Sequence, residues 1–113
     1  MTMSSPAQTG FNIQATLFFA PEDTPRVLEA LKPVYEQTIA EPECLSFQVY
    51  QLRDDPGQIL LVEDWETPLD RYMTERLKVD YMQEFFAIIQ PLFTRPQEVK
   101  VFDRLGQFHH IEL

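Results

Sequence analysis

The sequence has 113 residues, enough for one domain with a modest hydrophobic core. Its formal net charge is -9 and its basic residues are scattered singly, which argues against binding to nucleic acid or to an anionic membrane. The single cysteine, Cys44, excludes an intramolecular disulfide, and we recognise neither a signal peptide nor a membrane-spanning segment, so a cytoplasmic protein is expected.

Polar residues flank the predicted domain at both ends. Residues 1–10 are expected to form a flexible leader, residues 11–105 the domain and residues 106–113 a tail. The tail carries His109 and His110, which point to opposite sides of an extended chain, so a shared metal site is not expected. A solvated tail is the simpler interpretation; a histidine that reaches the site would instead supply a base.

The first part of the domain predicts a strand and a helix. Residues 11–19 alternate between an apolar face and a mixed polar and aromatic face, which indicates a strand. Thr24 and Pro25 fit the N-cap and the first helical position of an amphipathic helix that runs to about Ala40. Pro33 lies inside this helix and is expected to kink it.

Two strands joined by a short hairpin follow. Residues 44–52 alternate, and residues 58–65 contain four consecutive apolar side chains, which is typical of a strand in the middle of a sheet. The turn at residues 54–57 makes the two strands antiparallel neighbours. Glu63 and Trp65 share one face of the second strand. The only tryptophan therefore lies where a cavity between the sheet and its helices would open.

Two helices and a strand complete the domain. Thr67 and Pro68 are expected to begin one helix, and Asp80 to cap the next with Gln83 in a capping box. Residues 98–105 predict the last strand. The order β-α-β-β-α-α-β indicates an α+β, ferredoxin-like fold, with helices on one face of an antiparallel sheet. Apolar residues on the other face predict a homodimer in which two sheets close into a barrel.

Five segments carry a resemblance to a known family: Leu31-Lys32-Pro33-Val34, the run from Glu41 to Tyr50, Asp55-Pro56-Gly57, Val62-Glu63-Asp64-Trp65-Glu66 and the run from Phe85 to Leu92. In this order and spacing the chain resembles the antibiotic-biosynthesis-monooxygenase-like (ABM) family of dimeric α+β barrels. The resemblance implies a monooxygenase that needs no cofactor and uses O2 on a small planar aromatic molecule such as a quinol, an anthrone or a polyketide. An electron-rich phenolate or carbanion can itself give an electron to oxygen, so the protein need only bind, assist deprotonation and exclude water.

The chain departs from this family at several positions. Glu43 stands where the family often has glycine, and both usual histidines are replaced, one by Arg76 and one by Tyr81. The haem-degrading branch has an asparagine at the position of Ala15 and a histidine ligand at that of Arg76; here only its tryptophan remains, as Trp65. Haem degradation is therefore not expected.

Nine residues are expected to line the predicted cavity. The predicted catalytic residues are Trp65, Arg76 and Tyr81, and the predicted substrate-binding residues are Ala15, Tyr72, Met73, Met82, Phe85 and Ile89. Trp65 would stack on the substrate ring and donate from its indole, Tyr72 and Tyr81 would hold its oxygens, and Arg76 would stabilise an anion. The simpler interpretation makes the aromatic and methionine side chains core residues and pairs Arg76 with Glu63 or Glu66.

Two other functions remain compatible with the same fold. One is a non-redox cyclase, isomerase or decarboxylase, which would turn over without oxygen. The other is a non-catalytic module for ligand binding or dimerisation, which the replacement of both family histidines favours.

Overall fold

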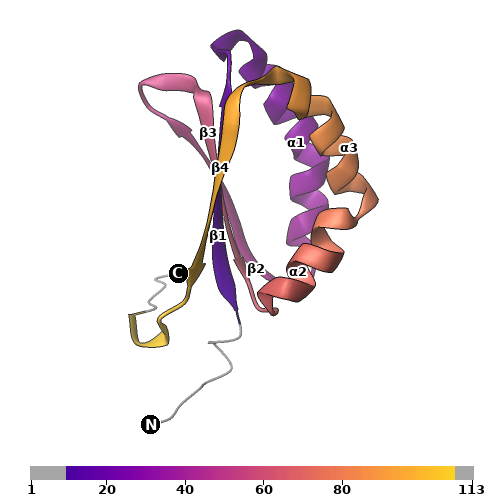
Figure 1. Cartoon of the computed structure of the whole chain (residues 1–113), viewed down its shortest axis with the longest axis vertical. Helices are drawn as coiled ribbons and strands as arrows, with labels where there is room; N and C mark the ends of the chain where they lie inside the picture. The colour runs from indigo at the N-terminus through magenta and orange to yellow at the C-terminus, as the bar shows by residue number, and fades with distance from the viewer. Residues whose placement is uncertain (1–9, 109–113) are drawn as a thin grey trace.

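The computed structural model describes residues 10–108 as an antiparallel sheet with helices on one side (Figure 1). Its main elements are β1 (Phe11–Phe19), α1 (Thr24–Ile39), β2 (Cys44–Leu52), β3 (Asp55–Trp65), α2 (Leu69–Glu75), α3 (Asp80–Ile89) and β4 (Phe93–Asp103). The strand order is β2-β3-β1-β4, so β1 and β3 are central. The predicted α+β, ferredoxin-like fold and the central position of residues 58–65 are confirmed.

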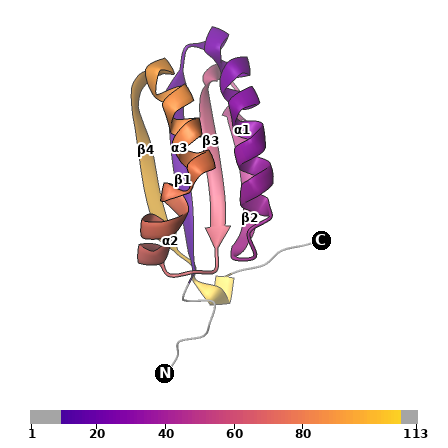
Figure 2. The same ribbon diagram turned by 90° about the vertical axis from the view of Figure 1, so that its right-hand side faces the viewer.

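Strand register decides which side chains face the helices. β1 pairs with β3 so that Ile13 lies opposite Glu63 and Ala15 opposite Leu61. Because side chains alternate along a strand, these residues share the covered face with Trp65. Figure 2 shows the helices in front of the sheet, with α1 on its β2 and β3 side and α3 on its β1 and β4 side.

The core contains two clusters of buried side chains. The larger cluster joins the sheet to α1 and α3; its buried members are Leu17, Phe19, Val27, Leu31, Val34, Phe47, Ile59, Leu61, Phe85 and Ile89. The smaller cluster lies at the end of β3 and contains Phe11, Ile13, Trp65 and Tyr72. Burial of these side chains is the main contribution to the stability of the fold.

The predicted N-caps are wrong for the first two helices. Thr24 lies inside α1 rather than before it, and its hydroxyl donates to the carbonyl oxygen of Pro56 at 2.9 Å. A 3-10 turn, Pro21–Asp23, precedes α1 and takes the place of a side-chain cap. Thr67 is buried and lies one residue before the N-cap position of α2, which Pro68 occupies. A threonine before a proline therefore predicted the start of each of these helices to within about two residues. It did not predict whether the threonine makes a capping hydrogen bond.

The capping box predicted for the third helix is also wrong. Val79, not Asp80, occupies the N-cap position of α3, and no side chain caps it. Gln83 instead donates from Nε2 to the carbonyl oxygen of Leu77 at 2.8 Å. Leu77 lies in a 3-10 turn, Arg76–Lys78, through which the chain leaves α2.

The last strand begins earlier than predicted, at Phe93 rather than Glu98. Its first residues pair with the end of β1, where Phe18 lies opposite Arg95. Pro96 falls where the register shifts between Thr16 and Phe18, and β4 is an edge strand, so a residue without an N–H is tolerated there.

Both chain ends limit what the structure describes. His109 and His110, on which one prediction depended, lie outside the described residues, as do residues 1–9. Gly10 is buried, and a side chain there would collide with the carbonyl oxygen of Trp65. Residues 106–108 form a 3-10 turn. No helix between residues 10 and 108 is long and apolar enough to cross a membrane.

Candidate functional site

A cavity of about 290 Å³ lies between the covered face of the sheet and the helices. Its walls come from β1, β2, β3, β4, all three helices and the 3-10 turn that follows α2, and most of their side chains are apolar. All nine residues predicted for the site lie around it: Ala15, Trp65, Tyr72, Met73, Arg76, Tyr81, Met82, Phe85 and Ile89. The volume is at the lower end of the range for ligand pockets, which suits a small molecule.

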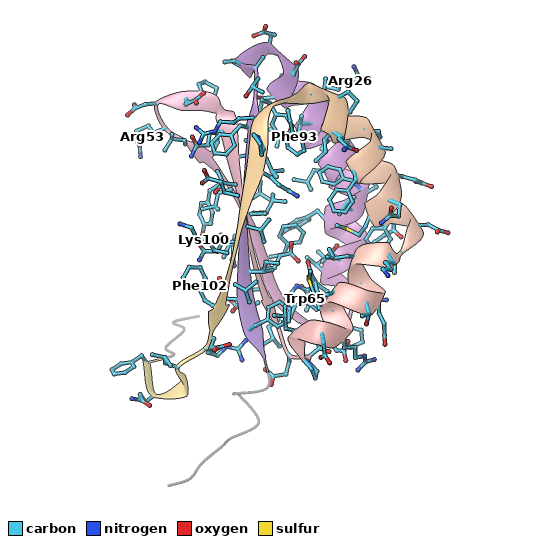
Figure 3. All side chains as sticks on the ribbon, in the orientation of Figure 1. Arg26, Arg53, Trp65, Phe93, Lys100 and Phe102 are labelled. Atoms are coloured by element: carbon cyan, nitrogen blue, oxygen red, sulfur yellow. The ribbon has the colours of Figure 1, made fainter. Side chains whose placement is uncertain are left out.

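Trp65 closes one end of the cavity. It is buried at the end of β3, and Figure 3 shows it on the helix side of the sheet, opposite Lys100 and Phe102. Its ring centroid lies 5.2 Å from that of Tyr72. Its indole Nε1 donates to Oε1 of Glu63 at 2.8 Å. The indole N–H, which was predicted to donate to a substrate, donates to a protein carboxyl instead, and Trp65 is part of the cavity wall.

Glu63 is the feature that sequence reasoning missed. It lines the cavity and lies on the covered face of a central strand, between Leu61 and Trp65. Burial raises the pKa of its carboxyl to about 7, although the hydrogen bond from Trp65 acts in the opposite direction. The signal was present as an acidic residue at an inward position of an otherwise apolar strand face.

The burial and charge of this region also act on two neighbouring groups. Burial, followed by the negative charge of Glu63, raises the pKa of the Tyr72 hydroxyl well above its usual range. Tyr72 is therefore a hydrogen-bond donor at any physiological pH. The same two causes raise the pKa of the partly buried Cys44 thiol to about 11, so this thiol is an unreactive group near neutral pH.

Arg76 lies at the rim of the cavity, in the 3-10 turn after α2. Its Nη1 lies 2.6 Å from Oε1 of Glu41, and its side chain is 23% exposed. The predicted pairing with Glu63 or Glu66 is wrong, because the partner comes from the loop between α1 and β2. Arg76 therefore lines the cavity while its guanidinium pairs with a carboxylate from a loop outside the sheet.

No metal-binding cluster was found in the part of the chain that the structure describes, where no three histidine, cysteine, aspartate or glutamate side chains converge. The polar groups of the cavity wall are instead a carboxyl, two phenols, a guanidinium, one amide and one hydroxyl, from Glu63, Tyr72, Tyr81, Arg76, Gln97 and Thr38. Such a set can exchange a proton with a bound molecule and hold its oxygens.

Comparison with known families agrees with this arrangement. The model of the family described as "Antibiotic biosynthesis monooxygenase" matches residues 10–87, which include both central strands and most of the cavity wall. The chain belongs to the antibiotic biosynthesis monooxygenase family. The family predicted from sequence segments is thereby confirmed.

Three similar proteins are each less than 25% identical to this chain. "Putative monooxygenase GME11364" from Pestalotiopsis microspora is 24% identical over 103 residues, which cover 91% of this chain and 86% of the relative. A conserved protein of Methanosarcina mazei Go1 has a similar structure, with a TM-score of 0.78, 18% identity and coverage of 88% of this chain and 96% of that one. Rv0793 of Mycobacterium tuberculosis gives a TM-score of 0.75, 23% identity and coverage of 85% and 95%. At these identities the two structures establish the shared fold.

This family member differs at the two positions where the resemblance places histidines. Arg76 and Tyr81 occupy them, and both side chains line the cavity. Glu63 is the only carboxylate that lines the cavity among residues 10–108.

Proposed function

We propose that this chain is a cofactor-independent monooxygenase that oxidises a small planar aromatic molecule with an acidic hydrogen, such as a quinol or an anthrone. The observation that carries the proposal is one apolar cavity bordered by aromatic rings, with a few polar groups from different elements at its wall. A planar substrate gains contact area against such rings, and the polar groups fix its orientation. Membership of the monooxygenase family supports the same reaction class.

Each predicted residue has a role that its position supports. The ring of Trp65 forms the wall on which the substrate stacks. The hydroxyls of Tyr72 and Tyr81 donate to its oxygens, and Tyr72 does so at every physiological pH because burial keeps it protonated. Arg76 stabilises the anion that deprotonation creates. Ala15, Met73, Met82, Phe85 and Ile89 shape the apolar remainder of the wall.

The reaction balances without an external reductant. A methylene group between two aromatic rings reacts with one molecule of O2 to give a diaryl ketone and one molecule of water, and the substrate supplies all the electrons. The protein has to hold the substrate, promote loss of a proton from carbon and exclude bulk water. The apolar lining of the cavity supports the last of these requirements.

Oxygen consumption by the purified protein with a panel of anthrones and quinols tests the proposal. We expect uptake that depends on the protein and incorporation of one atom of 18O2 into the product. Arg76→Ala and Tyr81→Phe are expected to reduce kcat/KM by about 10- to 100-fold, because each removes a group that stabilises the anion. Turnover that proceeds equally well without oxygen would instead identify a non-redox isomerase or cyclase. Binding without any turnover would identify a ligand-binding module.

We also propose that two copies pair through the uncovered face of the sheet. This face presents Tyr50 and Phe102, which are 53% and 45% exposed, beside the partly buried Leu60 and Val62. Figure 3 shows Phe102 directed away from the helices. Sedimentation is expected to give twice the chain mass, and Tyr50→Asp is expected to give monomers; a wild-type monomer would contradict the pairing.

A further inference from the structure

We propose that Glu63 is the general base of this site, taking a proton from the substrate and returning it to the oxygenated intermediate. This inference rests on the proposed function, since it assigns the proton transfers that the oxygenation needs. Neither the family match nor the predicted site residues assign a role to this side chain.

The position of the carboxyl suits proton transfer. Its Oε1 is fixed by the indole of Trp65 at 2.8 Å, whereas Oε2 accepts no hydrogen bond from residues 10–108. One oxygen is therefore held in place by the protein, and the carboxyl lies in the wall of the cavity that a substrate would enter.

No other side chain of the cavity wall is an equal candidate. The titratable groups that share the site with Glu63 are Tyr72 from α2, Arg76 from the following turn and Tyr81 from α3. Tyr72 keeps its proton because its pKa is raised. Arg76 is protonated and paired with Glu41.

The strands β1 and β4 add no competing acid or base to the cavity wall. β1 contributes Ile13, Ala15 and Leu17, and β4 contributes Gln97, Val99 and Val101. From β2, the thiol of Cys44 interacts with the charge of Glu63 but is itself protonated near neutral pH, because its pKa is about 11. Glu63 is thus the group whose charge changes in this region near neutrality.

The acid strength of Glu63 suits a group that both accepts and donates protons. A carboxyl with its ordinary pKa is a weak base toward a carbon acid, whereas a pKa of about 7 makes the carboxylate more basic and still leaves it ionised above neutral pH. Once protonated, the same group is a competent acid toward a peroxide anion.

The proton transfers close a complete reaction. Oε2 of Glu63 takes one hydrogen of the methylene as a proton, and the C–H electron pair stays on carbon. The carbanion and O2 form a C–O bond, and the protonated Glu63 gives its proton to the terminal peroxide oxygen. Glu63 then takes the second C–H proton while the O–O bond breaks and hydroxide leaves. Hydroxide and the proton on Glu63 form water, and the carboxylate is regenerated.

Hydrogen–deuterium exchange at the methylene of anthrone, measured in heavy water without oxygen, isolates the first of these steps. We expect the wild-type protein to catalyse exchange with a rate that rises with pH through an apparent pKa of about 7. Glu63→Gln is expected to lower the exchange rate by about 100-fold or more, the usual contribution of a general base. Glu63→Asp retains a displaced carboxyl and is expected to retain part of the rate. Glu36→Gln, which changes an exposed carboxylate on α1, is the matched control and is expected to behave as wild type.

Trp65→Phe tests whether the indole tunes the acidity of Glu63, because a purely structural role of Trp65 would leave the pH profile of exchange unchanged. Removal of the indole donor is expected to shift the pH profile of exchange upward, because that hydrogen bond favours the ionised carboxyl. Circular dichroism and thermal unfolding establish that each variant is folded. A profile that stays in place would contradict the pairing of these two side chains.

The outcomes separate this inference from the proposed function. Oxygen uptake that survives Glu63→Gln together with undiminished exchange would overturn the base and leave the oxygenase standing. Wild-type exchange that depends on Glu63 without oxygen uptake would support the base and overturn the oxygenase. Absence of both exchange and uptake in the wild-type protein would overturn both.

Discussion

The two faces of the sheet treat neighbouring carboxylates on β3 in opposite ways. On the uncovered face, Asp64 accepts hydrogen bonds from Asn12 and Ser46, each at 3.1 Å, and lies 3.6 Å from Nη2 of Arg104. On the covered face, Glu63 accepts one hydrogen bond, from the indole of Trp65, and is otherwise surrounded mainly by apolar side chains. A carboxylate with several donors stabilises the fold, whereas one with a single donor is left able to change its charge.

The largest expected effect is a loss of stability when Asp64 is removed from the uncovered face. Asp64→Ala removes one of the acidic partners of Arg104, whose side chain is only 7% exposed, and leaves Asn12 and Ser46 without their acceptor. We expect a loss of about 3 kcal/mol in the free energy of unfolding, because removal of one partner leaves a largely buried charge less compensated. Urea denaturation measures it. Glu75→Ala, which breaks an exposed pair with Arg71, is the control, with a loss below about 0.5 kcal/mol.

The second effect concerns Glu63 on the covered face, where removal of the carboxyl is expected to raise the stability of the protein rather than lower it. The unfolded chain loses the Glu63 proton near the ordinary pKa of 4.5, whereas the folded chain keeps it until about 7, so the wild-type protein loses stability as pH rises between these values. Glu63→Gln has no charge to bury. We expect its stability to match that of the wild type at pH 4 and to exceed it by about 3 kcal/mol at pH 8, because a shift of about 2.5 pKa units costs about 1.4 kcal/mol per unit. Thermal unfolding at both pH values measures the difference, and an equal difference at both would contradict the assigned burial.

The smallest effect extends the comparison to a third carboxylate. Glu41 neutralises Arg76 at the cavity rim, where both side chains are partly exposed, at 30% and 23%. Glu41→Gln is therefore expected to cost less than about 1 kcal/mol in unfolding free energy. It also leaves the guanidinium without its counter-charge, so affinity for 2-naphthoate is expected to rise several-fold. Isothermal titration measures this affinity, and unchanged binding would place Arg76 outside the ligand site.

Alternation along strands made the sheet and its covered face predictable. The apolar run at residues 59–62 indicated a central strand, and the spacing of Trp65 from it placed the indole at the cavity. The helical spacing that placed Tyr81, Met82 and Phe85 on an inner face worked for the same reason, because period and burial are coupled in an amphipathic helix.

Polar contacts were less predictable because they depend on short turns and on residues distant in sequence. Arg76 lies in the 3-10 turn after α2 and pairs with Glu41, which is 35 residues away in the sequence. Gln83 uses a carbonyl that the same turn exposes, in place of its predicted capping role. The inward direction of Glu63 was predicted, but its raised pKa was not. That pKa depends on how deeply the folded chain buries the carboxyl, which the sequence does not show.

The protonated thiol of Cys44 has a consequence for the lifetime of such a catalyst. Oxygenation through a peroxide exposes the protein to leaked hydrogen peroxide, which attacks thiolates far faster than thiols. Cys44 packs against the cluster around Trp65, and its Sγ donates to the carbonyl oxygen of Ser46 at 3.6 Å. Burial, followed by the negative charge of Glu63, keeps this sulfur in its unreactive thiol form. In the proposed oxygenase, the group that serves as the base would therefore also help to keep a neighbouring sulfur from being oxidised.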